Sequence, residues 1–362
     1  MTPLTMTLDD YRSEIDRIDR EVIRLLQERQ MFSTKIGETK RARGVSIYAP
    51  DREEALLCKL EGLAGETLPS KAIRTIYREI ISLSICAQMG NPVAYLGPEG
   101  TYTQQAALKS FGSSVPMRAM PSIPDVFAAV ERGEAIYGVI PIENSTEGAV
   151  VHSLDMLAES GLKIVAQVYL SIEHCLLSRH PLKAIRRVAS KDIALAQCRN
   201  WLQRNLPGVE LLPVESTAAA VRRMETEPDI AAIASAASSS IYGVPILVQG
   251  IQDKTDNVTR FLVVSATPNP SGALCEEKTS LVFSLRHEPG ALQKALQPFS
   301  DRGLNLTRIE SRPNRRIAWE YLFFIDLIAH WQEPRMQDAI DELKKVCDGV
   351  KWLGSYPNSG NI

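Results

Sequence analysis

The sequence of residues 93–111 is VAYLGPEGTYTQQAALKSF, and it indicates the fold class of the middle of the chain. Its first four residues are apolar and predict a buried strand, and a Gly-Pro turn then leads into a helix from about Tyr102. The same change recurs after three further predicted strands, at 136–141, 187–190 and 211–214, with helices from about Glu147, at 192–206 and at 217–224. Strands that alternate with helices are typical of an α/β domain.

The composition is that of an ordinary globular chain of two to three domains. The 362 residues are 44% hydrophobic and 23% charged, and the net charge of −2 argues against nucleic acid as the main partner. Six widely spaced cysteines without a CxxC pair predict reduced thiols, and the five histidines have no metal-ligand spacing. We expect a cytoplasmic protein without a bound metal, since the N-terminus has no signal-peptide pattern.

Residues 230–252 carry no charge and are long enough to cross a bilayer. Several serines, a glycine and a proline interrupt this segment. We therefore predict a buried helix of small residues followed by a buried strand, and no membrane span.

The N-terminal segment has a helical pattern. Apolar residues recur every three or four positions from Leu8, so one helix could run to about Arg41, with further helices from Pro50 and Pro69. A helix of this length exceeds the usual 8–20 residues and suggests a bundle or a helical dimer.

Cationic side chains share a face of the first helix. Arg29 and Lys40 are about three turns apart, whereas Arg12 lies roughly 40 Å from Lys40 along the axis. Arg12 is therefore either a surface residue or part of a site in a second chain. Further donors follow at Arg52, Ser84 and Gln88. Cationic and polar side chains of this kind could bind a small dicarboxylate. The alternative interpretation is that they form ion pairs on solvated helix surfaces and bind no ligand.

Three loops of the α/β segment follow a strand and precede a predicted helix, at 97–103, 143–148 and 215–217. Free N–H groups at a helix N-terminus bind anions, so the three loops together favour a carboxylate-binding cleft, with ordinary capping as the alternative. His174-Cys175 has apolar neighbours and is predicted to lie in a buried strand. The last segment, after a linker at 266–278, predicts the order βαββαβ of a ferredoxin-like domain.

Several motifs resemble known families. Gly97-Pro-Glu-Gly-Thr-Tyr102, Pro141-Ile-Glu-Asn-Ser-Thr-Glu-Gly148, Ala194-Leu-Ala-Gln-Cys198 and Thr259-Arg260-Phe261 resemble the signatures of prephenate dehydratases. Gly290-Ala291-Leu292 and Glu310-Ser311-Arg312-Pro313 resemble the phenylalanine-binding ACT domain. The helical segment resembles the all-helical chorismate mutases. Together the chain is similar to bifunctional chorismate mutase–prephenate dehydratases.

The resemblance implies three domains. They are an all-α chorismate mutase bundle at 1–91, an α/β dehydratase of two lobes at 92–267, similar to type II periplasmic binding proteins, and an α+β ACT domain at 278–357. It also implies a homodimer or higher oligomer. No cofactor is expected, because the mutase reaction is a pericyclic rearrangement. The expected small-molecule partners are chorismate, prephenate and the effector L-phenylalanine, with no nucleic acid and no membrane.

For the mutase site, the resemblance implies that Arg12 of the partner chain, Arg29 and Arg52 bind the dianion. Lys40 and Gln88 would donate to the ether oxygen and the nearby carboxylate, and Glu53 and Ser84 complete the set. For the dehydratase site, Thr259 is the implied acid or hydrogen-bond donor. The implied substrate-binding residues are Thr101, Tyr102, Asn144, Ser145, Thr146, Ser216, Thr217, Arg260 and Phe261.

The implied phenylalanine site comprises Gly290, Ala291, Leu292, Glu310, Ser311, Arg312 and Pro313. The chain departs from the family pattern in two places: Ala49 stands where some mutases have an acidic residue, and 191–193 is Lys-Asp-Ile where many dehydratases have His-Pro-Gln. Two alternatives stay open, a dehydratase that prefers arogenate and a non-catalytic amino-acid sensor with a dimerising helical segment.

Overall fold

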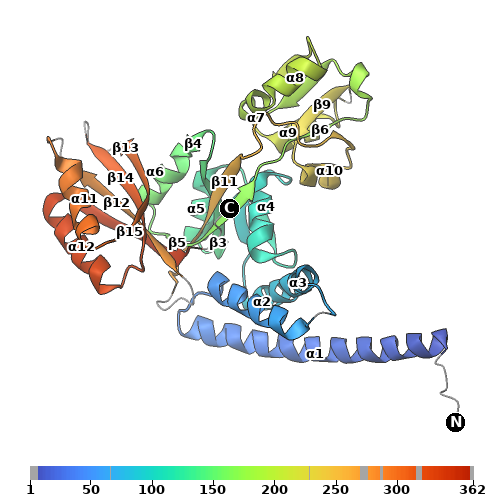
Figure 1. Ribbon diagram of the computed structural model, residues 1–362, viewed down its shortest axis with the longest axis horizontal. Helices are drawn as coiled ribbons and strands as arrows, with labels where there is room; N and C mark the ends of the chain where they lie inside the picture. Colours follow the sequence, from blue (N-terminus) through green and yellow to red (C-terminus); the bar gives the residue numbers. More distant parts are fainter. Residues whose placement is uncertain are drawn as a thin grey trace.

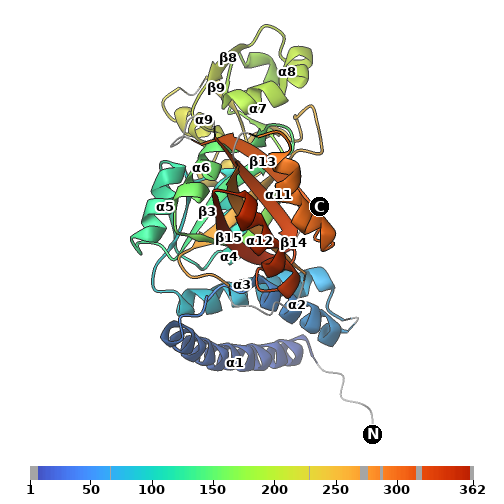
Figure 2. The ribbon, with the colours of Figure 1, turned by 90° about the vertical axis from the view of Figure 1, so that its left-hand side faces the viewer.

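A computed structural model describes residues 7–65, 67–227, 229–269, 276–285, 288–314 and 320–358. Figure 1 shows a helical block at the bottom, a central α/β lobe above it, a second α/β lobe at the upper right and a C-terminal domain at the left. The view turned by 90° shows that the helical block and the second lobe lie at opposite ends of the molecule (Figure 2). The multidomain layout predicted from the sequence is confirmed.

The helical block consists of α1 (Leu8–Ala42), α2 (Pro50–Ala64) and α3 (Ser70–Gln88). A capping box of Thr7 and Asp10 begins α1, which confirms the single long helix. The C-terminal part of α1 packs closely on α3: a Cβ at Gly37 would lie 2.8 Å from Cγ of Gln88. This close approach requires glycine.

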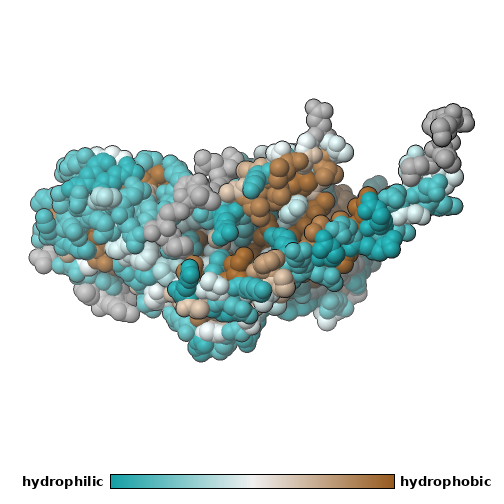
Figure 3. Space-filling model, turned by 90° about the horizontal axis from the view of Figure 1, so that it is seen from below, coloured by the Kyte–Doolittle hydropathy of each residue, from teal (hydrophilic) through white to brown (hydrophobic). Residues whose placement is uncertain are grey.

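The N-terminal part of α1 projects from the block with its apolar side chains exposed. The exposed side chains on this helix are Leu8, Tyr11, Ile15, Ile18, Val22, Ile23, Leu25, Met31, Phe32 and Ile36. Hydrophobic surface also gathers on the side of the molecule seen from below (Figure 3). A long amphipathic helix with an uncovered apolar face is typical of a helix that packs against another chain.

The first lobe has a sheet in the order β2-β1-β3-β11-β5, with the short β4 beside β3. Its elements are β1 (Val93–Leu96), α4 (Tyr102–Phe111), β2 (Met117–Met120), α5 (Ile123–Glu131), β3 (Tyr137–Asn144), β4 (Gly148–Ala149), α6 (Val151–Glu159), β5 (Lys163–Ser171) and β11 (Val258–Ser265). The strand predicted at 93–96 and the helix from Tyr102 are confirmed.

The second lobe has a sheet in the order β10-β6-β9-β7-β8. Its elements are β6 (Cys175–Leu177), the 3-10 helix η1 (Leu182–Ala184), β7 (Arg187–Ser190), α7 (Asp192–Gln197), α8 (Arg199–Asn205), β8 (Glu210–Pro213), α9 (Thr217–Arg223), β9 (Ile230–Ala234), α10 (Ala236–Tyr242) and β10 (Ile246–Val248). The chain enters this lobe after β5 and returns before β11, which gives the expected two-lobed domain.

Three sequence predictions in these lobes are wrong. Residues 230–234 form strand β9 and not a helix. The prediction failed because a strand buried on both faces has no alternation of polar and apolar residues, so its periodicity does not distinguish it from a buried helix. No helix begins at Glu147: Oδ1 of Asn144 accepts the N–H groups of Thr146 and Glu147 and closes a turn between β3 and β4. The helix predicted at 192–206 is interrupted at Cys198, where Asp253 accepts the N–H groups that open α8.

No helix within the described ranges is both long and apolar enough to cross a bilayer. The linker predicted at 266–278 is described only in part, since 270–275 lie outside the described residues.

The C-terminal domain has the predicted order βαββαβ. Its elements are β12 (Glu277–Leu285), α11 (Ala291–Asp301), β13 (Leu306–Pro313), β14 (Tyr321–Ile328), α12 (Pro334–Val346) and β15 (Gly349–Pro357). The strand order is β13-β14-β12-β15, so β13 and β15 are the edges.

Strand β15 packs this domain against β5 of the first lobe. Gly354 lies at φ +151°, and a Cβ there would lie 2.2 Å from the carbonyl oxygen of Ile164. Lys163 Nζ donates to the carbonyl of Trp352 at 2.6 Å. Lys351 Nζ donates to the carbonyls of Leu157, Ala158 and Ser160 at the end of α6. The C-terminal domain is therefore closely joined to the lobe that carries Thr259.

Candidate active and regulatory sites

In the helical block, α1 and α3 bring together Arg29, Ser84 and Gln88. Arg29 donates to the Ser84 hydroxyl and, at 3.4 Å, to the carbonyl of Ile80. Gln88 Nε2 donates to the carbonyl of Ser84 at 3.0 Å, whereas its buried Oε1 has no hydrogen-bond partner in the described part of the chain. A buried amide and a guanidinium thus meet at one place, as a site for a carboxylate requires.

Lys40, Arg52 and Glu53 form a second group, where α1 faces the start of α2. Lys40 Nζ donates to the carbonyl of Ile47 at 2.7 Å, and burial, with Arg52 nearby, lowers the pKa of Lys40. Burial raises the pKa of Glu53 to about 8, against the opposing effect of Arg78 and Lys40. Near neutral pH the Glu53 carboxyl is therefore mainly protonated and can donate a hydrogen bond.

Arg12 does not reach either group within one chain. It forms an ion pair with Asp9 at 3.2 Å, and its side chain is 67% exposed. It lies on the projecting part of α1, roughly 40 Å along the helix from Lys40. Ala49 occupies the N-cap of α2 and provides no side-chain hydrogen bond there.

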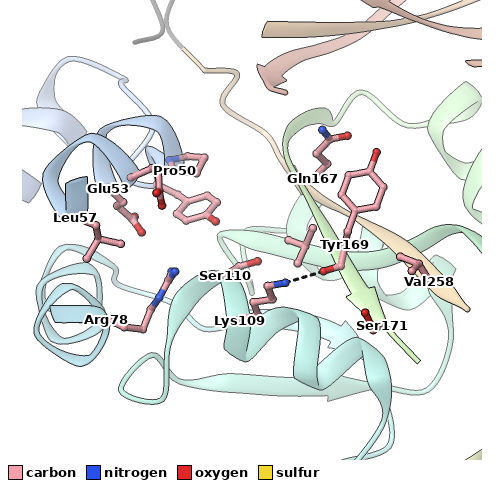
Figure 4. Close-up of a pocket in the computed structure, with 13 residues that line it drawn as sticks. Pro50, Glu53, Leu57, Arg78, Lys109, Ser110, Gln167, Tyr169, Ser171 and Val258 are labelled. Atoms are coloured by element: carbon pink, nitrogen blue, oxygen red, sulfur yellow. Dashed lines mark hydrogen bonds between the residues drawn. The ribbon is translucent and has the colours of Figure 1, made fainter. Parts of the chain in front are cut away.

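A cavity of about 610 Å³ lies between the helical block and the first lobe (Figure 4). Glu53 and Arg78 line it from the helical block, and Lys109 and Tyr169 line it from the first lobe. Lys109 Nζ donates to the carbonyl of Tyr169 at 2.8 Å. Val258, which precedes Thr259, also lines the cavity. Sequence reasoning missed Arg78 and Lys109, because neither lies in a motif.

Thr259 and Asn144 form the centre of a polar cluster at the end of the first lobe's sheet. They are register partners on β11 and β3, and Nδ2 of Asn144 donates to Oγ1 of Thr259 at 2.7 Å and to Oδ1 of Asn257 at 2.7 Å. Oδ1 of Asn144 accepts the Thr146 hydroxyl at 2.6 Å. Because Thr259 Oγ1 already accepts a hydrogen bond from Asn144, the threonine proton is available for a ligand.

The second lobe contributes Gln197 and His174 to this cluster. Gln197 Nε2 donates to Thr146 Oγ1 at 3.0 Å, and its Oε1 accepts from Asn257 Nδ2 at 3.0 Å. His174 Nε2 lies 2.9 Å from the same oxygen, and its Nδ1 lies 3.1 Å from the Tyr102 hydroxyl. Burial lowers the pKa of His174, so its ring is neutral near pH 7. The cluster thus bridges both lobes.

Among these residues, sequence reasoning missed Asn257, Gln197 and His174 as members of the cluster. Gln197 lies inside the Ala194–Cys198 motif, which was the available signal. Cys175 does lie in the buried strand β6, as predicted, and burial raises the pKa of its thiol.

The other predicted dehydratase residues stabilise the loops around the cluster. Ser145 Oγ accepts the N–H of Val258 at 2.9 Å. Thr101 and Ser216 are the N-caps of α4 and α9, as ordinary capping predicts. The two helix starts meet where the lobes meet, since a Cβ at Gly100 would lie 3.6 Å from that of Ala218, the residue after Thr217.

Arg260 and Phe261 do not line the cluster. Phe261 is buried in the core of the first lobe. Arg260 contacts Asp326 at 2.7 Å and Tyr356 at 2.9 Å in the C-terminal domain, and Glu143 at 3.2 Å. Its guanidinium therefore faces the C-terminal domain, on the opposite side of β11 from Thr259.

The two predicted phenylalanine-binding motifs lie at one end of the C-terminal sheet. Leu285 at the end of β12 and Pro313 at the end of β13 both pair with Tyr321 of β14. Gly290 has φ +78° and is the N-cap of α11, a conformation that favours glycine. Ser311 is exposed on the edge strand β13, while Arg312 forms a 3.5 Å ion pair with Asp155 of α6.

Comparisons with known proteins agree with this arrangement. Family models match at residues 11–89 (chorismate mutase type II), 93–269 (prephenate dehydratase) and 279–348 (ACT domain). The chain is 43% identical over 358 residues to a bifunctional chorismate mutase/prephenate dehydratase of Aquifex aeolicus, covering 97% of this chain and 98% of the relative. It is 40% identical to that of Neisseria gonorrhoeae, with 98% and 99% covered.

A solved prephenate dehydratase of Arthrobacter aurescens in complex with L-Phe is also similar. It matches with a TM-score of 0.69 and 33% identity, over 74% of this chain and 90% of that chain. The three matched domains follow one another in the order of the bifunctional relatives, and those relatives are covered almost from end to end. The chain therefore belongs to the family of bifunctional chorismate mutase/prephenate dehydratases.

Proposed function

We propose that this chain converts chorismate to prephenate and prephenate to phenylpyruvate in L-phenylalanine biosynthesis, and that L-phenylalanine inhibits it. The observation that carries the proposal is the hydrogen-bonded pair of Asn144 and Thr259 in a chain whose helical block also gathers Arg29, Ser84 and Gln88.

The mutase step is a rearrangement within one molecule and needs no nucleophile. The residues have to hold the compact conformer of the dianion and stabilise the negative charge that develops on the ether oxygen. Arg29 and Arg52 bind the carboxylates, while Lys40 and Gln88 donate to the ether oxygen. Protonated Glu53 supplies a further donor, as its raised pKa of about 8 supports.

The mutase site is shared between two chains. The exposed apolar face of α1 packs against a second copy, and Arg12 of one chain completes the site of the other. This arrangement accounts for the distance between Arg12 and the rest of the set, and it buries side chains that a single chain leaves exposed.

The dehydratase step removes the ring hydroxyl and the ring carboxylate of prephenate as water and CO2. Aromatisation drives the reaction, so the site assists mainly the departure of the hydroxyl. Thr259 donates to the leaving oxygen while Asn144 fixes the position of the threonine oxygen. Ser145, Thr146, Thr101, Tyr102 and the Ser216–Thr217 helix start surround the carboxylates and the keto group.

The ACT domain binds L-phenylalanine between two copies. The edge strand β13 carries Glu310 and Ser311, and Gly290 lies at the same end of the sheet. An exposed edge strand is suited to pairing with the same strand of a partner.

Steady-state kinetics with chorismate, prephenate and arogenate, each with and without phenylalanine, test the proposal. We expect turnover of chorismate and prephenate, and inhibition of the second reaction. Faster turnover of arogenate than of prephenate would favour the arogenate dehydratase. Absence of all turnover in a folded protein that binds phenylalanine would favour the non-catalytic sensor.

A further inference from the structure

A buried ionic cluster joins the ACT domain to the two strands that carry Thr259 and Asn144. Arg260 lies 2.7 Å from Asp326 and 3.2 Å from Glu143, and the side chains of Arg260 and Asp326 are only 4% and 5% exposed. The Tyr356 hydroxyl accepts from Arg260 at 2.9 Å. Arg308 of β13 donates to the same carboxylate, that of Glu143, at 2.5 Å. Asp326 of the ACT domain thus pairs with Arg260 of the dehydratase, and Arg308 of the ACT domain pairs with Glu143.

The register of β3 and β11 makes this pair the immediate neighbour of the active-site pair. Thr259 is paired with Asn144, and the next two residues, Arg260 and Glu143, are paired with each other. Successive side chains of a strand point to opposite faces, so one pair lies in the polar cluster and the other faces the ACT domain. A shift of the Arg260–Glu143 pair therefore moves the backbone that sets the Asn144–Thr259 distance.

In the ACT domain, the same cluster lies next to one of the two phenylalanine motifs, because both include residues of β13. Arg308 and Asp326 are register partners on β13 and β14. Glu310 and Ser311 follow Arg308 on β13 by two and three residues. A rearrangement of β13 on binding phenylalanine would reach Arg308 directly.

We propose that Arg260 is a positioning residue, which holds Thr259 and Asn144 in place and transmits the state of the ACT domain to them. This inference rests on the proposed function, with Thr259 as donor and phenylalanine as effector. Breaking one partner from a buried ion pair is costly, so the cluster has few stable arrangements. Phenylalanine inhibits by binding better to the arrangement that is less active.

Asp326→Asn tests the transmission, since it removes the charge that faces Arg260 and leaves every proposed active-site residue intact. Lys351→Met is the matched control: Lys351 also joins the ACT domain to the first lobe, but through carbonyls at the end of α6 that are not part of the cluster. The measurements are dehydratase kcat and KM with and without saturating phenylalanine, and phenylalanine binding by calorimetry. Mutase activity of the same chain reports folding.

We expect Asp326→Asn to bind phenylalanine within about threefold of wild type but to lose roughly tenfold or more of the inhibition, within the range of allosteric coupling. Lys351→Met should remain inhibited as wild type. Arg260→Lys should lower kcat with little change in KM, because a lysine keeps the charge but not the two-sided contact with Asp326 and Glu143. If Asp326→Asn does not fold, Tyr356→Phe, which removes one hydrogen bond to Arg260, should show a smaller loss of inhibition.

Unchanged inhibition in folded Asp326→Asn or Tyr356→Phe would overturn the inference, as would equal loss of inhibition in Lys351→Met. These outcomes require a wild type that turns over prephenate and responds to phenylalanine. A wild type without that turnover would instead refute the proposed function, so the two failures are distinguishable.

Discussion

Replacing Glu53 by glutamine should remove most of the pH dependence of stability in the helical block between pH 6 and pH 8. The side chain is partly buried between α1, α2 and α3, where it faces Lys40, Arg78 and Asp51. Burial is the largest influence and raises the pKa of the carboxyl from 4.5 to about 8. Glutamine keeps the size and a donor group but cannot ionise.

The magnitude follows from the difference in proton binding between the folded and unfolded states. Because the folded-state pKa is raised, Glu53 stabilises the fold while it is protonated, and this contribution is lost as the pH rises through about 8. For a pKa of 4.5 in the unfolded state, the contribution is about 2.7 kcal/mol at pH 6 and about 0.4 kcal/mol at pH 8. The wild-type block should therefore be about 2.3 kcal/mol less stable at pH 8 than at pH 6.

Hydrogen exchange of the amides in α2 and α3, measured by mass spectrometry on the full chain, reports this local stability. After correction for the intrinsic exchange rates, wild-type protection should fall roughly 50-fold between pH 6 and pH 8, and Glu53→Gln should show little change. Amides of β9 in the second lobe, at the opposite end of the molecule from the helical block, are the internal control. An equal fall in protection for wild type and Glu53→Gln would refute the assignment of a raised pKa to this residue.

Three further predictions concern the proposed sites. Thr259→Ala should lower dehydratase turnover by about 10²-fold or more and leave mutase turnover within a few-fold, and a normal dehydratase rate in a steady-state assay would remove Thr259 from the mechanism. Mixing Arg12→Ala chains with Arg29→Ala chains should restore part of the mutase activity, since one composite site regains both arginines, whereas no recovery despite confirmed subunit exchange would contradict a shared site. Ser311→Ala or Gly290→Val should weaken phenylalanine binding in calorimetry while uninhibited dehydratase turnover stays within a few-fold, and unchanged binding would place the effector elsewhere.

Much of the fold could be predicted because local signals agreed with tertiary packing. The spacing of apolar residues from Leu8 predicted α1, and the hydroxyls of Thr101 and Ser216 marked helix starts that the structure places there. Strand β9 could not be predicted, because Ile230–Ala234 is buried on both faces and has no alternation of polar and apolar residues. The turn after β3 was mistaken for a helix start, since the same polar residues serve both structures.

The composition of the candidate sites was harder to predict from the sequence than the fold. The motif Thr259-Arg260-Phe261 identifies three neighbours, but only the sheet decides that the first lies in the cluster, the second against the ACT domain and the third in the core. Asn257 and Gln197 are hydrogen-bonded although 60 positions separate them in the chain. Such contacts follow from how the two lobes meet, which periodicity and spacing do not encode.

Because β15 is the last described strand of the chain, the dehydratase lobes are synthesised before the ACT domain can pack fully on them. This strand packs on β5 and approaches Ile164 so closely at Gly354 that no other residue fits, yet the ribosome makes it after every other described strand. At about 5–20 residues per second, several seconds pass between the synthesis of Thr259 and that of Gly354. Once β11 is complete, the nascent chain contains all strands of both dehydratase lobes but still lacks β15, the strand that packs the ACT domain on β5. The proposed feedback control therefore depends on the last described strand that the ribosome makes.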